Sequence, residues 1–485
     1  MVQRVNPILR GMYPDPSICR VDDLYYIVTS TFEYLPGLPV HVSRDLVEWR
    51  LVGHAIDSPH QLDPSRQFDY GGVGDSRGLF APTIRHHDGL FYIACTLMVG
   101  EDARNFYLTS ADPAGPWSEP VILPDARGID PSLFFHGGRA WWIGCREVAE
   151  QSFEGETEVW MRELDLERGA LVGDERVIWT RTMARAVWAE APHLYHRDGW
   201  FYLVTAEGGT AFEHSVMVAR SRDLTGPYLP CPRNPVLTHR HLGHGVPVQN
   251  VGHADLVEDP DGGWWMVVLA TRPVDGHHIL GRETHLARVT WEDDWPVVNA
   301  GQGMLEAPVA SPGRWGSEGA AAVGDFLTVR GFPSFAEQDD RGVVLRATGG
   351  PVALLRRLTS IDSTVTVTFD ELHAGAVAGL VLRQSDSTQV RLELREGRAE
   401  LVVSHDGDTL VAGIPVPAGR IELAARVSAG GVAWFAGGAE VGRTPLSALS
   451  TETAGGFVGT TFGPYVDGPR GASVRFIAWT QEDFG

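Results

Sequence analysis

The sequence contains no lysine, so all 40 of its basic residues are arginines. This absence excludes chemistry that needs an amine side chain, such as P-loop and kinase phosphate binding or Schiff-base and pyridoxal-phosphate catalysis. The 62 acidic residues outnumber the arginines and give a net charge of −22. We therefore expect no nucleic-acid partner and no membrane partner, because both surfaces are anionic.

Cysteine and long apolar runs are also scarce. Cys19, Cys95, Cys145 and Cys231 are far apart and form no CxxC pair, so neither a zinc site nor a disulfide framework is expected. The longest apolar runs, such as Trp264–Ala270, are too short to span a bilayer, and the first residues contain no apolar signal segment. These features predict a soluble, cytoplasmic protein.

Against these absences stands a repeat that occurs five times: a short strand, a polar turn, and a second strand that begins with aromatic residues. The aromatic strands begin at Tyr25, Phe91, Trp141, Phe201 and Trp264. Their spacing of 50 to 66 residues leaves room for about four strands per unit. We therefore predict an all-β fold in which residues 1–304 form a five-bladed β-propeller. A sandwich or barrel with coincidental aromatic hairpins is the alternative.

The repeat stops near Trp295, and a stretch rich in Gly, Pro, Ala and Ser follows. We expect a linker over residues 305–323. Beyond it, short alternating segments such as Val365–Phe369 and Val390–Leu394 lie between Gly and Asp turns. They predict a second, all-β sandwich domain over residues 324–485.

The start of each repeat supplies the candidate site. Counting ten or eleven residues back from the aromatic pairs reaches Asp15, Phe80, Asp130, Glu190 and His253. The innermost strands of a propeller lie side by side along its channel, so residues in equal phase should converge there. Each residue alone has a structural explanation, as an Asx turn, a strand-edge carboxylate or a packed histidine. Together, converging carboxyl groups should raise the pKa of at least one member.

Two carboxyl groups of opposite protonation on either side of a sugar-sized gap are what glycoside hydrolysis requires. Phe32 and Phe80 could stack on sugar faces, and Arg282 could bind sugar hydroxyls or a neighbouring carboxylate, or form an exposed salt bridge. A non-catalytic carbohydrate-binding propeller would need the aromatic residues and Arg282, but not all three carboxyl groups. A protein-interaction propeller would instead carry a recurring surface signature.

Six ordered motifs resemble those of glycoside hydrolase family 43, in particular its two-domain β-xylosidases and α-L-arabinofuranosidases. The motifs are Met12–Ser17, Gly128–Ser132, Glu190–Tyr195, Glu207–Thr210, Gly252–Asp255 and Gly281–Thr284. The resemblance covers the whole predicted propeller, and more loosely the sandwich. Many family members carry Trp where this chain has Phe80.

The resemblance implies an inverting exo-glycosidase in which Asp15 is the general base, Glu190 the general acid, and Asp130 the residue that tunes and orients the acid. It places around the terminal sugar Phe32, Phe80, Ala81, Thr210, His253, Arg282 and, from the sandwich, Phe462. No cofactor is required, although some relatives hold calcium in the channel. The expected substrates are small xylo-oligosaccharides cleaved by a β-D-xylosidase, with α-L-arabinofuranosidase as the alternative, and a homo-oligomer is left open.

Overall fold

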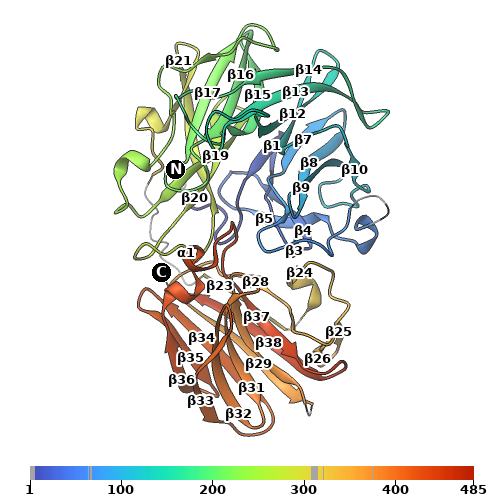
Figure 1. Ribbon diagram of the computed structural model, residues 1–485, viewed down its shortest axis with the longest axis vertical. Helices are drawn as coiled ribbons and strands as arrows, with labels where there is room; N and C mark the ends of the chain where they lie inside the picture. The colour runs from blue at the N-terminus through green and yellow to red at the C-terminus, as the bar shows by residue number, and fades with distance from the viewer. Residues whose placement is uncertain are drawn as a thin grey trace. The chain divides into compact units, whose positions relative to one another are not determined.

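The computed structural model describes residues 6–63, 65, 68–306, 315–320, 322–373 and 375–484. This part of the chain is almost entirely β-structure, coloured along the chain in Figure 1. It divides into two compact units. The first unit contains mainly Tyr13–Arg272 and the two strands that directly follow Arg282. The second unit contains Pro273–Gly281 and the C-terminal part of the chain. No described helix is long and apolar enough to cross a bilayer.

The first unit is a propeller of five antiparallel sheets, which confirms the predicted fold. Blade 1 contains β1 (Ser17–Val21), β2 (Leu24–Val28), β4 (Gly37–Ser43) and β5 (Arg50–Ile56). Blade 2 contains β6 (Gly78–Leu79), β7 (Thr83–His87), β8 (Leu90–Val99), β9 (Asp102–Ser110) and β10 (Val121–Ile122). Blade 3 contains β11 (Ile129–His136), β12 (Arg139–Glu147), β13 (Thr157–Asp165) and β14 (Ala170–Trp179).

Blade 4 contains β15 (Glu190–Arg197), β16 (Trp200–Glu207), β17 (Ser215–Ser221) and β18 (Leu229–Pro230). Blade 5 contains β19 (Gln249–Glu258), β20 (Trp264–Thr271), β21 (Glu283–Glu292) and β22 (Trp295–Val298). The N-terminal segment also joins blade 5, because the Ile8 amide donates a 2.9 Å hydrogen bond to the Thr284 carbonyl. The two ends of the propeller segment thus meet in blade 5, which helps to close the ring of blades.

The aromatic residues of the repeat pack between neighbouring blades. One hydrophobic cluster joins Ile18 and Tyr25 of blade 1 to Trp265 and Val267 of blade 5. Similar clusters join blades 2 and 3, 3 and 4, and 4 and 5. The hydrophobic effect therefore holds the blades together through their faces, which leaves the starts of the innermost strands free for polar residues.

The second unit contains two antiparallel sheets around one hydrophobic core, which confirms the predicted sandwich. One sheet contains β25 (Ala336–Asp339), β26 (Gly342–Arg346), β38 (Ser473–Asp483), β29 (Ser363–Leu372), β34 (Ile421–Ser428), β35 (Gly431–Ala436), β36 (Ala439–Thr444) and β23 (Trp315–Ala320). The other contains β27 (Val352–Ala353), β28 (Arg356–Arg357), β37 (Thr461–Asp467), β30 (Val377–Arg383), β31 (Thr388–Arg395), β32 (Arg398–His405) and β33 (Asp408–Pro415).

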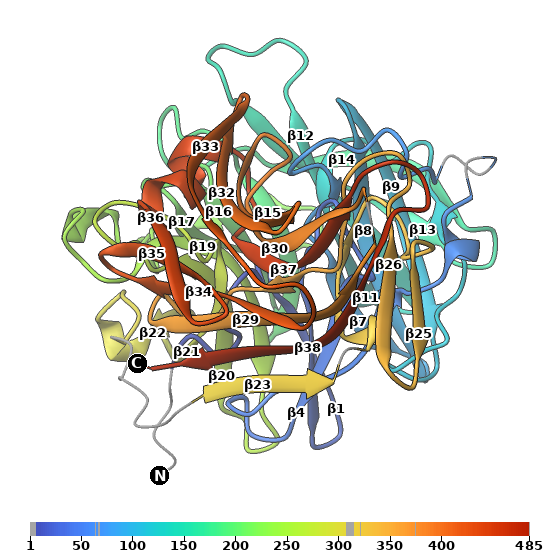
Figure 2. The same cartoon turned by 90° about the horizontal axis from the view of Figure 1, so that it is seen from below.

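Part of the range expected as a linker forms structure. β23 pairs antiparallel with β38, and Figure 2 shows the two strands side by side. Composition rich in Gly and Ala suggested a connecting segment, but backbone pairing needs no apolar side chain. A glycine-rich strand can therefore complete a sheet edge when its partner strand is already in place.

Candidate active site

Cross-strand pairing aligns the five innermost strands and corrects the count made from the sequence. In each blade, one residue of the innermost strand pairs with the equivalent residue of the second strand. We call these five innermost-strand residues the second layer: Ser17, Thr83, Ser132, His193 and Asp255. Two positions earlier stand the residues of the first layer: Asp15, Ala81, Asp130, Ala191 and His253.

Phe80 and Glu190 therefore precede the first layer by one residue, and their expected equal phase with Asp15 is wrong. In blades 1, 2 and 4, the turn between the first two strands has the same length. The first-layer residue therefore lies the same number of residues before the aromatic residue in all three blades.

Four first-layer residues have a left-handed backbone, which is rare for residues other than glycine. The φ angles of Asp15, Asp130, Ala191 and His253 are 54°, 52°, 50° and 52°. Each such residue costs about 1–3 kcal/mol. In blades 3, 4 and 5 the strand pairing also shifts at this point, as in a β-bulge, which re-aims a side chain. Equal strain at the same place in several blades is typical of a functional site.

Asp15 is nearly fully buried and is held by an arginine. Arg282 donates to its carboxylate through Nη1 to Oδ1 at 2.8 Å and through Nη2 to Oδ2 at 3.2 Å. Ser30 donates a further hydrogen bond to Oδ2. Arg282 Nη1 also donates to Thr210 Oγ1 at 3.0 Å, and the guanidinium lies 5.5 Å from the centre of the Phe32 ring. This bidentate arrangement fixes the direction of the Asp15 carboxylate.

Asp130 and Glu190 are linked through the backbone that follows Glu190. The Ala191 amide donates to Asp130 Oδ2 at 3.2 Å. Burial raises the pKa of Asp130 to about 6, with the Asp15 charge acting in the same direction and His253 opposing it. Burial, followed by the charges of Asp130 and Asp15, raises the pKa of Glu190 well above its usual range, although Arg282 opposes this shift.

The remaining predicted residues of the first unit border these carboxyl groups. His253 Nδ1 lies 3.7 Å from Asp15 Oδ1. Phe32 and Phe80 meet edge to face, with ring centres 5.5 Å apart. A narrow recess is lined by Ala81, Pro82, Thr83, Asp130, Pro131, Ala191, His193 and His253. The structure thus brings Phe32, Phe80, Ala81 and His253 to one place. Phe462, in contrast, lies on β37 with a fully buried side chain in the core of the second unit.

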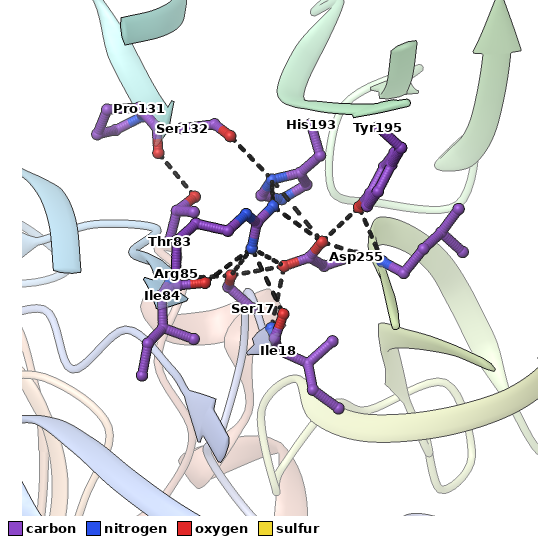
Figure 3. Close-up of polar contacts among 11 residues, drawn as sticks. Ser17, Ile18, Thr83, Ile84, Arg85, Pro131, Ser132, His193, Tyr195 and Asp255 are labelled. Atoms are coloured by element: carbon purple, nitrogen blue, oxygen red, sulfur yellow. Dashed lines mark hydrogen bonds and ion pairs between the residues drawn. The ribbon is translucent and has the colours of Figure 1, made fainter. Parts of the chain in front are cut away.

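The second layer forms a polar network that sequence reasoning missed (Figure 3). Arg85 donates to the Asp255 carboxylate at 2.8 and 3.1 Å and to His193 Nδ1 at 3.0 Å. Ser17 donates to Asp255 at 2.6 Å, and Tyr195 also donates to it. Four of these residues, all except Arg85, stand inside the motifs quoted from the sequence, but only their pairing in space reveals that they meet.

The network carries a defined charge state. Burial alone would raise the pKa of Asp255, but the Arg85 guanidinium and the hydrogen bonds outweigh it and hold this pKa well below its usual range. Burial lowers the pKa of His193 to about 3, and the Arg85 charge acts in the same direction. Because a guanidinium only donates, Nδ1 of the neutral His193 must accept, and its proton is on Nε2.

The channel carries a positive charge at its second layer. Among the described residues, no group of three or more His, Cys, Asp or Glu side chains is placed to hold a metal. Asp255, the carboxylate of the second layer, is already paired with Arg85. The positive guanidinium would repel a divalent cation at this point.

Three carboxyl groups meet at one end of a propeller channel, one of them bound by an arginine and one with a strongly raised pKa. This fold and site define a glycoside hydrolase that works with carboxyl groups. The chain belongs to glycosyl hydrolases family 43, whose family model matches residues 5–296. Residues 339–478 match the beta xylosidase C-terminal Concanavalin A-like domain. Inversion at the anomeric carbon is general in this family.

The chain is similar to several known proteins. It is 40% identical over 516 residues to a xylosidase/arabinosidase of Butyrivibrio fibrisolvens, covering 96% of each chain. It is 43% identical over 296 residues to the non-reducing end alpha-L-arabinofuranosidase BoGH43B of Bacteroides ovatus, covering 60% of this chain and 53% of that protein. Its structure is similar to a xylan beta-1,4-xylosidase of Bacillus halodurans, with a TM-score of 0.88, 28% identity and coverage of 99% and 100%.

Proposed function

We propose that this protein is an inverting β-D-xylosidase that removes terminal xylose from short β-1,4-xylo-oligosaccharides. The observation that carries the proposal is the opposite environment of two carboxyl groups at one site. Asp15 is paired with Arg282, whereas Glu190 has a pKa well above its usual range because of burial and neighbouring negative charge. An ionised and a protonated carboxyl group at neutral pH are the two groups that glycoside hydrolysis needs.

In this mechanism Glu190 is the general acid that protonates the glycosidic oxygen as the bond breaks. Asp15 is the general base that takes a proton from the attacking water on the opposite face of the sugar. The bond from carbon to the leaving oxygen breaks while the bond from carbon to the water oxygen forms, so the configuration inverts. The two hydrogen bonds from Arg282 keep the Asp15 carboxylate aimed at that water.

Asp130 is the positioning residue of the acid. Its carboxylate accepts a hydrogen bond from the Ala191 amide, directly after Glu190, and its charge contributes to the raised pKa of Glu190. The sugar would be enclosed by Phe32, Phe80 and Ala81 on the apolar side and by Thr210, His253 and Arg282 on the polar side. This mixture suits a pentose ring, whose C–H faces are apolar and whose edge carries hydroxyl groups.

An α-L-arabinofuranosidase is the second candidate, favoured by the 43% identity to the Bacteroides ovatus enzyme over the propeller. The Butyrivibrio fibrisolvens relative carries both activities in its name. Both sugars are pentoses with similar hydroxyl patterns, so the same pocket could accept either. The expected cytoplasmic location, the absence of a metal requirement and the oligomeric state stay predictions.

The test compares p-nitrophenyl β-D-xyloside with p-nitrophenyl α-L-arabinofuranoside. We expect a larger kcat/KM for the xyloside, and proton NMR of the first product should show α-xylose before mutarotation. A larger kcat/KM for the arabinofuranoside would replace the first candidate by the second. Glu190→Gln should abolish hydrolysis of xylobiose, whereas the control Glu258→Gln, at an exposed carboxylate, should leave it unchanged.

A further inference from the structure

Trp188 differs from the other tryptophans of the propeller that are partly exposed. Five of them pack against the hydrophobic clusters between blades: Trp49, Trp141, Trp200, Trp264 and Trp291. Trp188 is not a member of those clusters, although it is also partly exposed. Core packing therefore does not account for its large apolar side chain.

The backbone of Trp188 is strained and held in place. Its φ angle is 54°, which is unusual for a bulky residue. The Trp188 amide donates to the Gly155 carbonyl at 2.8 Å, and the Gly208 amide donates to the Val187 carbonyl at 2.8 Å. Two other loops, those with Gly155 and Gly208, thus hold this segment. A rare conformation that is fixed in this way points to a function for the side chain it presents.

The indole ring is fixed as well. A Cβ atom on Gly155 would lie 3.1 Å from Trp188 Nε1, and one on Gly209 would lie 3.3 Å from its Cδ1. Both glycines also have positive φ angles, of 76° and 70°. The ring therefore sits where only glycine lets the neighbouring loops approach. Among the described residues, no acceptor is bound to Nε1, so the indole N–H is available to a ligand.

The position of Trp188 relative to the carboxyl groups identifies the ligand. Trp188 stands two residues before Glu190, and its ring lies beside Gly209, which precedes Thr210, the residue bound to Arg282. A general acid must lie beside the glycosidic oxygen, between the terminal sugar and the leaving group. Residues that surround the terminal sugar occupy the other side of that oxygen, so a surface next to the acid faces the leaving group.

We infer that Trp188 is the binding platform for the leaving-group sugar, the neutral sugar residue that is released when the terminal pentose is removed. The flat indole stacks on the C–H face of that sugar, and its N–H donates to a hydroxyl group. This inference rests on the proposed function, because it takes Glu190 as the acid. It also gives the enzyme a preference for sugar leaving groups over small ones.

The test uses two substrates with the same terminal sugar: xylobiose, whose leaving group is a sugar, and β-D-xylosyl fluoride, whose leaving group is a single atom. In Trp188→Ala, the ratio of kcat/KM for xylobiose to kcat/KM for the fluoride should fall about 10- to 100-fold. Trp188→Phe should restore much of the ratio, because a phenyl ring still stacks. The control Trp200→Ala, in the same blade, should leave the ratio unchanged.

An unchanged ratio in Trp188→Ala, with both substrates hydrolysed by the wild-type enzyme, would overturn this inference and leave the proposed function intact. If Trp188→Ala loses activity on both substrates, the same ratio of kcat/KM values is measured for Trp188→Leu and compared with wild type at matched thermal stability. Equal losses of kcat/KM on xylobiose and on the fluoride again overturn the inference. If the wild-type enzyme hydrolyses neither substrate but does hydrolyse the arabinofuranosyl counterparts, the same ratio is measured on those. Failure on all of them removes the proposed function itself.

Discussion

Replacing Asp255 by Asn should destabilise the propeller more than any single exposed charge change. The Asp255 carboxylate is fully buried and lies 2.8 Å from the Arg85 guanidinium. It also accepts hydrogen bonds from the Ser17 hydroxyl at 2.6 Å and from the Ile18 amide at 3.0 Å. Asn keeps the shape but leaves the buried guanidinium without its counter-charge. Breaking a buried pair in this way costs about 3–5 kcal/mol.

The expected loss translates into a measurable shift. A change of 1 kcal/mol moves the melting temperature of a large domain by about 2–4 °C, so Asp255→Asn should lower it by roughly 6–20 °C. The assay is thermal unfolding followed by circular dichroism or calorimetry at neutral pH. The matched control is Asp23→Asn, whose partner Arg44 is exposed like Asp23 itself, with about 70% of each side chain accessible. That change should cost no more than about 1 kcal/mol.

The pH dependence provides a second readout of the same pair. The pKa of Asp255 is lowered in the folded protein, so its contribution is fully present above the ordinary aspartate pKa and is lost only as the pH falls through the lower, folded value. The difference in stability between wild type and Asp255→Asn should therefore stay constant from neutral pH to about pH 4. A difference below about 1 kcal/mol, or one that already shrinks near pH 6, would refute this reasoning.

Three further outcomes follow from the site. Asp130→Asn removes a negative charge that helps to raise the pKa of Glu190, so the alkaline limb of kcat/KM against pH should move to lower pH; a limb that stays in place contradicts the coupling. Glu190→Ala should lose much more activity on xylobiose than on activated aryl glycosides, because only the former needs a proton on its leaving group; equal losses would remove Glu190 from the acid role. Treatment with EDTA, and later addition of calcium, should leave kcat/KM within about twofold, because Arg85 already supplies positive charge in the channel; a loss that calcium restores would contradict this.

The local sequence was enough to predict the blades. A short polar turn followed by aromatic and β-branched residues favours a hairpin, and five such copies favour a propeller over a sandwich or barrel. The motifs also placed Asp15, Asp130 and Glu190 near the starts of innermost strands, since each stands just before such a hairpin. This part of the fold depends on neighbours in the chain, which the sequence displays directly.

The tertiary structure determines the register and the long-range contacts, which local sequence patterns do not show. The first-layer residue of blade 4 is Ala191 and not Glu190, and only cross-strand pairing reveals this difference of one residue. Arg85 and Asp255 are 170 residues apart, so no periodicity links them, yet their charges meet in the channel because five strands converge there. Such features depend on which distant segments become neighbours, and that is settled by the packing of whole blades against one another.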